Sequence, residues 1–329
     1  MKERLPANLA FDLARTTEAA ALAAGRWIGL GERALADKQA TEKMVAALNR
    51  IKFEGRIVIG ESTVSKIPFY KHGEKVGTGD GPRLDLLIDA IDGSAQLSKG
   101  SAGAISAAAV APAGSMAELI NVSYMRKIVV DSDVAPYMVS QCLDAPPAWT
   151  LALVARAKKR KVSTLTVFVL DRPRHKDITE EIRSAGAHVM LAPDGDIAGG
   201  LLAAFHDTGV DLLLGTGGVV EGIMVACAVK ATGGMLIAQL DPHTDQEIKN
   251  VRAAGFDPGQ VYTHNDLVKS DQIYFAATGI NDGPILSGVK YKGGLAKTHS
   301  ILLRGETRTR REMIAEHLLD ENRAEDQPD

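Results

Sequence analysis

The sequence has 329 residues, of which 45% are hydrophobic and 24% charged, with a formal net charge of -3 at pH 7 and a pI near 6.3. A slightly acidic chain argues against nucleic acid as the main partner, because proteins that bind the phosphate backbone usually carry a basic domain. The two cysteines, Cys142 and Cys227, stand in no metal-binding or CxxC spacing, which argues against a disulfide framework or a zinc site. No signal peptide or membrane-spanning run is recognisable, so we expect a cytoplasmic protein without a membrane partner.

The first part of the chain is predicted to form helices and then strands. Apolar spacing predicts a helix over 8–29, with Asn8 as its N-cap, and a second helix over about 38–49. Strands are expected at "RIVIGES" (56–62), "LDLLIDA" (84–90), "AISAAAVA" (104–111) and "KIVVDS" (127–132). This order is typical of an α+β unit with an antiparallel or mixed sheet, and we assign it residues 1–150.

A different rhythm follows Pro146, Pro147 and the basic run at 156–161. From there to residue 240, strands and helices alternate, which indicates an open α/β sheet with crossover helices. Late strands are expected at "DQIYFAATGI" (271–280) and "THSILLRG" (298–305). We assign residues 151–329 to this second unit and place the domain boundary near residue 150.

Acidic residues follow a predicted buried strand in the stretch "LLIDAIDGSAQL" (86–97). Asp89 and Asp92 would repel each other unless a cation lies between them, and a hard divalent cation prefers such oxygen ligands. Two such ions could orient water and neutralise the leaving group of a phosphate ester. Ser94 could orient the water, or begin a helix whose N-terminus holds the phosphate. Asp37, Glu61 and Glu221 also lie at predicted element ends, although a cap, a loop acid and a first-turn acid would each explain one of them.

A second polar group follows the later strands. Arg172 and Arg174 in "DRPRH" suit a distal phosphate, because a guanidinium makes forked contacts to phosphate oxygens. Asp194 and Asp196 in "PDGD" could accept hydrogen bonds from sugar hydroxyls, although Pro-Asp-Gly is also a common turn sequence. The glycine runs at 77–81 and 215–218 match neither the Walker A pattern nor the dinucleotide fingerprint. We interpret His175 as a structural partner.

The motifs together resemble a known family. Glu61 in "IVIGE", followed by D-x-I-D-G-S at 89–94, resembles the signature of the lithium-sensitive, magnesium-dependent phosphatase superfamily. Within it, nearly the whole chain resembles class II fructose-1,6-bisphosphatase. The stretches that carry this closer resemblance are "TEAAALAAGRWIGLGERALAD", "HGEKVGTG", "RPRH", "PDGD", "GTGGVVEG", "SDQIYFAATGI" and "LLRGETRTRR".

The resemblance implies an αβαβα sandwich, usually oligomeric as a dimer or tetramer, that hydrolyses the 1-phosphate of fructose 1,6-bisphosphate to give fructose 6-phosphate in gluconeogenesis. It implies Mg²⁺ or Mn²⁺, with ligands at Asp37, Glu61, Asp89, Asp92 and Glu221. It also implies catalytic roles for Ser94, Asp89, Asp92 and Arg33. The implied substrate contacts are Asp92, Gly93, Ser94, Tyr124, Arg172, Pro173, Arg174, Asp194, Gly195, Asp196 and Gly218.

The sequence departs from the family pattern at several positions. The loop at 62–66 lacks the acids that the family carries after its glycine-glutamate. Other differences are Arg33 for a lysine, Ala90 and Val220 for prolines, Asp92 for the commoner glutamate and Ser94 for a threonine. Two alternatives therefore stay open. The same chemistry could act on sedoheptulose 1,7-bisphosphate or another sugar or cyclitol phosphate, or the chain could bind a sugar phosphate without turnover.

Overall fold

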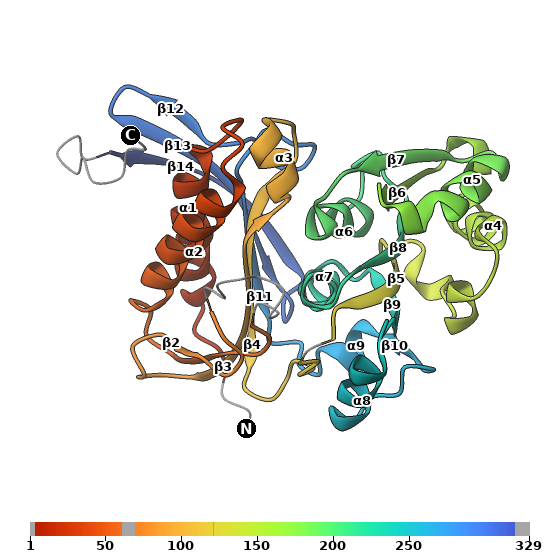
Figure 1. The fold of residues 1–329 in the computed structure, drawn as a ribbon, viewed down its shortest axis with the longest axis horizontal. Coiled ribbons are helices and arrows are strands. Elements are labelled where there is room, and N and C mark those ends of the chain that lie inside the picture. Colours follow the sequence, from red (N-terminus) through yellow and green to blue (C-terminus); the bar gives the residue numbers. More distant parts are fainter. Residues whose placement is uncertain (1–3, 61–69, 121, 320–329) are drawn as a thin grey trace.

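The computed structural model describes residues 4–60, 70–120 and 122–319. Two mixed β-sheets stand roughly side by side (Figure 1). The first sheet has the order β12-β13-β11-β4-β3-β1-β2, with β14 paired to β13, and the second has the order β10-β9-β5-β8-β6-β7. The strands of the first sheet are β1 (Glu54–Ile57), β2 (Lys75–Val76), β3 (Arg83–Asp92), β4 (Ile105–Pro112), β11 (Tyr274–Gly279), β12 (Lys290–Lys292), β13 (Leu295–Arg304) and β14 (Thr309–Leu318). Those of the second are β5 (Tyr124–Val130), β6 (Thr166–Leu170), β7 (His188–Ala192), β8 (Leu212–Gly218), β9 (Met235–Leu240) and β10 (Val261–Thr263).

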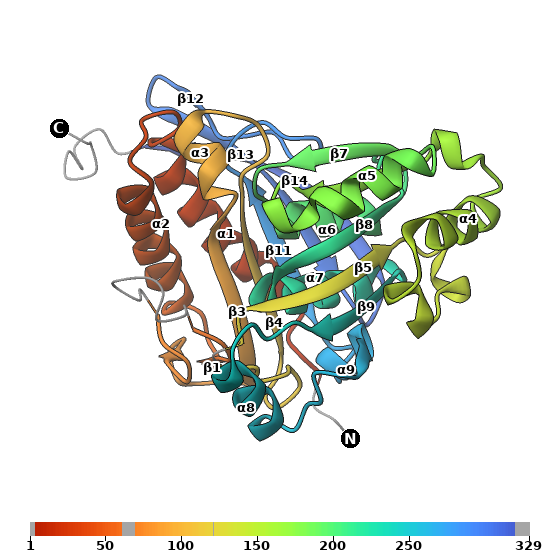
Figure 2. The same ribbon diagram turned by 45° about the vertical axis from the view of Figure 1, so that its right-hand side comes forward.

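Helices cover the outer faces of both sheets and fill the space between them. The helices α1 and α2 lie on the outer face of the first sheet, and α6 and α7 lie between the two sheets (Figure 1). Figure 2 shows α4 and α5 on the outer side of the second sheet. This layering confirms the αβαβα sandwich. The helices are α1 (Leu9–Gly25), α2 (Arg33–Leu48), α3 (Ser94–Lys99), α4 (Pro147–Ala157), α5 (Lys176–Ser184), α6 (Asp196–Ala204), α7 (Val219–Thr232), α8 (Asp245–Ala253) and α9 (His264–Leu267).

The central strand β3 carries a continuous apolar run at 86–88 because both of its faces are buried there. Side chains alternate between the two faces of a strand. Accordingly, Leu86 and Ile88 pack with α1 and α2, whereas Leu87 packs with the core around α6 and α7. A third core joins the outer face of the second sheet to α4 and α5 through residues such as Val154 and Ile182. None of the described helices is both long and apolar enough to cross a membrane.

The predicted helices and strands are present, with some local differences. The helix α2 begins at Arg33, so Asp37 lies within it and does not open it. Asn8 occupies the N-cap position of α1, but its side chain makes no capping hydrogen bond. Of the strand predicted over 56–62, only residues 56 and 57 belong to a strand, at the end of β1 (Glu54–Ile57). Residues 58–60 are not in a strand, and residues 61 and 62 lie outside the described residues.

The division of the chain between the sheets differs from a single cut near residue 150. The strand β5, at Tyr124–Val130, already belongs to the second sheet, and β11 to β14 return to the first. The physical reason is long-range pairing: β11 hydrogen-bonds to β4 on one side and to β13 on the other. Local periodicity carries no information about such pairing, so the two predicted units remain only a proposal about domains.

Candidate active site

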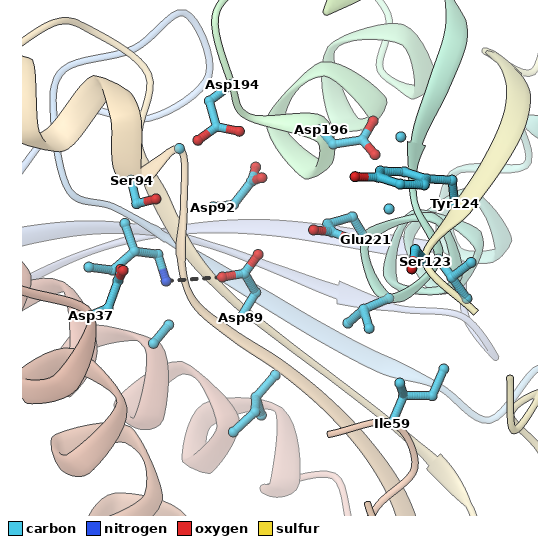
Figure 3. A pocket seen from close by; sticks show the side chains of 18 of the residues that line it. Asp37, Ile59, Asp89, Asp92, Ser94, Ser123, Tyr124, Asp194, Asp196 and Glu221 are labelled. Atoms are coloured by element: carbon cyan, nitrogen blue, oxygen red, sulfur yellow. Dashed lines mark hydrogen bonds between the residues drawn. The ribbon is translucent and has the colours of Figure 1, made fainter. Parts of the chain in front are cut away.

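A cavity of about 510 Å³ opens where the two sheets and the middle helices meet. It is lined from both sheets, by the ends of β3, β6 and β8 and the starts of β5 and α7. Figure 3 shows that most of its acidic side chains point toward the same space. Glu61 and the loop at 62–66 lie outside the described residues. Pro173 and Gly195 lie beside the cavity and do not line it. The predicted site residues that do line it are Arg33, Asp37, Asp89, Asp92, Gly93, Ser94, Tyr124, Arg172, Arg174, Asp194, Asp196, Gly218 and Glu221.

An irregularity in β3 brings Asp89 and Asp92 to the same side. On a regular strand, residues three positions apart point to opposite faces. Here Asp89 pairs with Ala107 and Asp92 with Ile105, so three positions along β3 are matched by two along β4. Such a β-bulge adds one residue and shifts the alternation. Both carboxylates therefore line the cavity (Figure 3).

Backbone amides bind the two carboxylates. The Oδ1 atom of Asp89 accepts a hydrogen bond of 3.1 Å from the amide of Ile91. The Oδ2 atom of Asp92 accepts one of 2.9 Å from the amide of Ala198, in the first turn of α6. A carboxylate at that position is also favoured by the helix dipole. Asp92 thus ties the first sheet to the helix that follows the predicted sugar-binding turn.

Electrostatic repulsion is concentrated at Asp89, Asp92 and Glu221. Burial raises the pKa of Asp89 well above its usual range, and the nearby charges of Asp92 and Glu221 raise it further. Burial also raises the pKa values of Asp92 and Glu221, with smaller contributions from Asp194 and Asp196. Among the described residues, no ion pair involves Asp89, Asp92 or Glu221. These three residues, called the unpaired acids below, form an all-oxygen donor set of the kind that hard divalent cations prefer.

The carboxylate oxygens of the unpaired acids are spread across the cavity. Within the described part of the chain, no three acids of this cavity offer oxygens that all lie within 4.8 Å of one another. A group that does meet that spacing is Asp131, Asp133 and His206, beyond the end of β5. There Asp131 already binds the ammonium group of Lys158 at 2.5 Å. A cation would have to displace that lysine, so we do not interpret this group as a metal site.

The two arginines are held by backbone carbonyls. Arg172 donates to the carbonyl of Pro193 and to Oδ1 of Asp194, the latter over 3.2 Å. Arg174 donates to the carbonyl of Thr216 over 2.8 Å and lies 5.0 Å from the ring centroid of Tyr124. A guanidinium carries five N–H donors, so these bonds leave both side chains able to bind an anion.

His175 is structural, in agreement with its interpretation from the sequence. Its Nε2 atom accepts a hydrogen bond of 2.8 Å from the amide of Thr216, so Nδ1 must carry the proton and donates it to the carbonyl of Leu170 over 2.7 Å. Burial lowers the pKa of this histidine, which favours the neutral ring that the two bonds require. His175 therefore fixes the backbone that holds Arg174.

Sequence reasoning missed Lys127. This side chain on β5 is fully buried, and its Nζ atom lies 2.6 Å from Oδ2 of Asp196. The sequence does carry a signal, because a lysine within the apolar run "KIVV" is unusual for a strand buried on both faces. Its partner could not be found that way, because 69 positions separate the two residues.

An αβαβα sandwich whose central cavity joins acids to arginines defines a class of phosphoric monoester hydrolases, the sugar phosphatases. The comparison with known families is more specific. A family model described as "Bacterial fructose-1,6-bisphosphatase, glpX-encoded" matches residues 7–317, and the chain therefore belongs to this family.

Two curated relatives agree with this assignment. The "Fructose-1,6-bisphosphatase class 2" of Haemophilus influenzae is 38% identical over 326 residues, which cover 95% of this chain and 97% of the relative. The "Fructose-1,6-bisphosphatase 1 class 2" of Escherichia coli strain K12 is 36% identical over 326 residues, covering 95% of this chain and 96% of the relative. Both alignments therefore span both sheets.

Proposed function

We infer that this protein hydrolyses fructose 1,6-bisphosphate, releasing the 1-phosphate and leaving fructose 6-phosphate. One observation supports this assignment most strongly: a single cavity carries the unpaired acids together with two arginines. A bisphosphate suits this arrangement, because one phosphate can bind at the acids through cations while the other binds the arginines directly. The bacterial relatives are named as fructose-1,6-bisphosphatases, which agrees with this substrate.

The acidic part of the cavity requires cations before it can accept a phosphate. Asp89, Asp92 and Glu221 would otherwise repel the anionic substrate. We assign Asp37, Asp89, Asp92 and Glu221 as ligands of Mg²⁺ or Mn²⁺, together with Glu61, which lies outside the described residues. Because no three of the described acids in this cavity offer oxygens within 4.8 Å of one another, bound ions would draw these side chains closer together. Bound ions of this kind polarise the phosphoryl group and neutralise the leaving oxygen.

The protein's own groups then position the substrate. Ser94, buried at the start of α3, donates to a phosphoryl oxygen or orients the attacking water, and Gly93 lets the backbone turn there with φ 98°. Asp194 and Asp196 accept hydrogen bonds from sugar hydroxyls. Arg172 and Arg174 hold the 6-phosphate, with Tyr124 and Gly218 beside it. Arg33 is exposed at the rim, where it can approach the 1-phosphate.

In the reaction, the water oxygen attacks phosphorus while the bond between phosphorus and the C1 oxygen breaks. The departing sugar oxygen then takes up a proton.

A cytoplasmic location and a dimeric or tetrameric state remain predictions.

Phosphate release tests the proposal. Purified protein with Mg²⁺ or Mn²⁺ should release inorganic phosphate from fructose 1,6-bisphosphate, and Asp89→Asn should lower the rate by at least about 100-fold. Asparagine keeps the shape of the side chain and an oxygen for the Ile91 amide, so folding should be retained. No release above the Asp89→Asn background would refute the assignment.

A substrate panel distinguishes the alternatives. Sedoheptulose 1,7-bisphosphate offers the arginines a similar distal phosphate, whereas inositol monophosphate offers none. If the wild type binds these compounds but releases phosphate from none of them, a non-catalytic binder is the better description. Acids introduced at Thr63 and Ser65 would then show whether the acid-poor loop is the cause.

A further inference from the structure

A fully buried lysine lies under the cavity. Lys127 has no exposed surface, and its ammonium group lies 2.6 Å from Oδ2 of Asp196, a residue that lines the cavity. Removing two charges from water is costly, and replacing such a pair by apolar residues is often neutral or stabilising. A pair of this kind is therefore weak evidence for a role in stability, and its position beside a candidate active site favours a functional explanation.

The surrounding backbone makes room for this pair. A Cβ atom at Gly217 would lie 1.9 Å from Oδ2 of Asp196 and 2.5 Å from Nζ of Lys127. The residues opposite Lys127 on the neighbouring strands are Gly215 and Ala238, both small. Lys127 on β5 and Asp196 at the start of α6 therefore fit together because β8 and β9 place small residues beside them.

Lys127 pairs with only one of the acids near it. The ionisable groups that act on it or on its partner are Asp196, Glu221, Asp92 and His175. His175 is held neutral by its two hydrogen bonds, and Lys127 binds only one of the acids directly. Asp196 is thereby neutralised, whereas Glu221 and Asp92 are not.

We propose that Lys127 is a positioning residue that reserves Asp196 for the sugar: it holds the carboxylate in place as a hydroxyl acceptor and keeps it out of the cation-binding set. The inference rests on the proposed function, since it names which acid takes substrate and which take cations. Lys127 does not touch the substrate, because its side chain is fully buried.

The first test separates KM from kcat. Lys127→Met should raise KM for fructose 1,6-bisphosphate by about 10-fold, the expected result of misplacing one charged hydrogen-bond acceptor, and change kcat by less than about 3-fold. Asp196→Asn should have the same effect. Because Lys127 acts through Asp196, the double variant should match Asp196→Asn alone. Multiplied effects in the double variant, or an unchanged KM in Lys127→Met, would overturn the proposal.

The chain offers a matched control for loss of a buried lysine. Lys230 on α7 is also buried, and its ammonium group binds Asp271 at 2.8 Å away from the cavity. Lys230→Met should lower the Tm and leave KM unchanged. If Lys127→Met does not fold, the double variant Lys127→Met/Asp196→Asn is measured instead, because it leaves neither buried charge without its partner. An unchanged KM in that variant would contradict the proposal.

Gly217→Ala tests the placement of the Lys127–Asp196 pair without changing either residue. Its methyl group would displace Asp196 and Lys127 without altering either, so KM should rise as in Lys127→Met. Wild-type KM in this variant would show that the exact placement of Asp196 does not matter to the substrate.

The second test does not depend on activity. Metal-depleted protein is titrated with Mn²⁺, and free Mn²⁺ is followed by electron paramagnetic resonance. In Lys127→Met the released carboxylate of Asp196 should lower the apparent Kd by about 5-fold or add a binding equivalent. Lys230→Met should match the wild type, and an unchanged titration in Lys127→Met would contradict the proposal. If the wild type releases no phosphate from fructose 1,6-bisphosphate, the proposed function fails, while this titration still tests the role of Lys127.

Discussion

Five acids of the cavity, Asp37 apart, fall into two groups with different surroundings. Asp194 and Asp196, called the paired acids below, bind Arg172 at 3.2 Å and Lys127 at 2.6 Å. The unpaired acids Asp89, Asp92 and Glu221 form no ion pair within the described part of the chain, and burial raises their pKa values. One arginine and one lysine thus neutralise the paired acids, whereas we infer that cations from solution neutralise the unpaired acids. This difference is the basis for our proposal that cations bind at the unpaired acids and the sugar at the paired acids.

The largest effect should come from a change in the unpaired acids. Glu221→Gln should lower kcat/KM for fructose 1,6-bisphosphate by at least about 100-fold, because it removes a ligand that stabilises charge in the transition state. Asp194→Asn, in the paired acids, should cost about 10-fold or less and act mainly on KM. Initial rates at saturating Mn²⁺ measure both. Equal losses in the two variants would remove the distinction between the groups.

A smaller effect should come from the arginines. Arg174→Met should raise KM for fructose 1,6-bisphosphate by about 10- to 100-fold, because it removes charge-assisted hydrogen bonds to the distal phosphate. With fructose 1-phosphate, which lacks that phosphate, the variant should match the wild type. Arg183→Met, an exposed arginine on α5, serves as the control. Similar losses with both substrates would place Arg174 outside the distal phosphate site.

The pH dependence of stability tests the unpaired acids directly. Because the pKa of Asp89 is raised in the folded state, its ionisation destabilises the metal-free protein at neutral pH, and this penalty disappears as the pH falls toward the unfolded value near 3.8. Metal-free Asp89→Asn should therefore melt about 2 °C above the wild type at pH 8, on the order of 1 kcal/mol.

The difference between Asp89→Asn and the wild type should vanish near pH 4 and reverse in saturating Mn²⁺, which stabilises only a protein that binds it. Scanning calorimetry with and without the metal measures these changes. A wild type more stable than Asp89→Asn at pH 8 without metal would contradict this interpretation.

The smallest effect should come from the turn that carries the paired acids. Gly195 has φ 90°, a region that side chains rarely adopt, and an added Cβ would lie 3.3 Å from Nε2 of Gln96. Gly195→Ala should cost about 1 kcal/mol of stability and raise KM by a few fold. Gly186 has φ 92° with no atom within 4 Å of an added Cβ. Gly186→Ala should therefore cost the same stability from strain alone and leave KM unchanged.

Several parts of the site could be predicted from local sequence. Asp89 and Asp92 lie at the end of a buried strand and Ser94 follows it. Arg172, Arg174, Asp194 and Asp196 follow strands of the second sheet, so each position could be predicted from the residues just before it. Asp37 was found as an acid but assigned to the start of a helix, whereas α2 begins earlier, at Arg33. Lys127 was missed because its meaning depends on a partner in another element.

The sequence by itself determined the order of the helices and strands and the residue types available for binding. Alternating and continuous apolar runs determine which faces of each element are buried, and the acids and arginines determine which ligands the strand ends can bind. Only the tertiary structure decided the rest. Strand pairing between β4 and β11 assigned the late strands to the first sheet, and the bulge in β3 turned Asp92 to the side of Asp89. The contact of Lys127 with Asp196 divided one set of acids into two, because the effect of a charge depends on its neighbours in space.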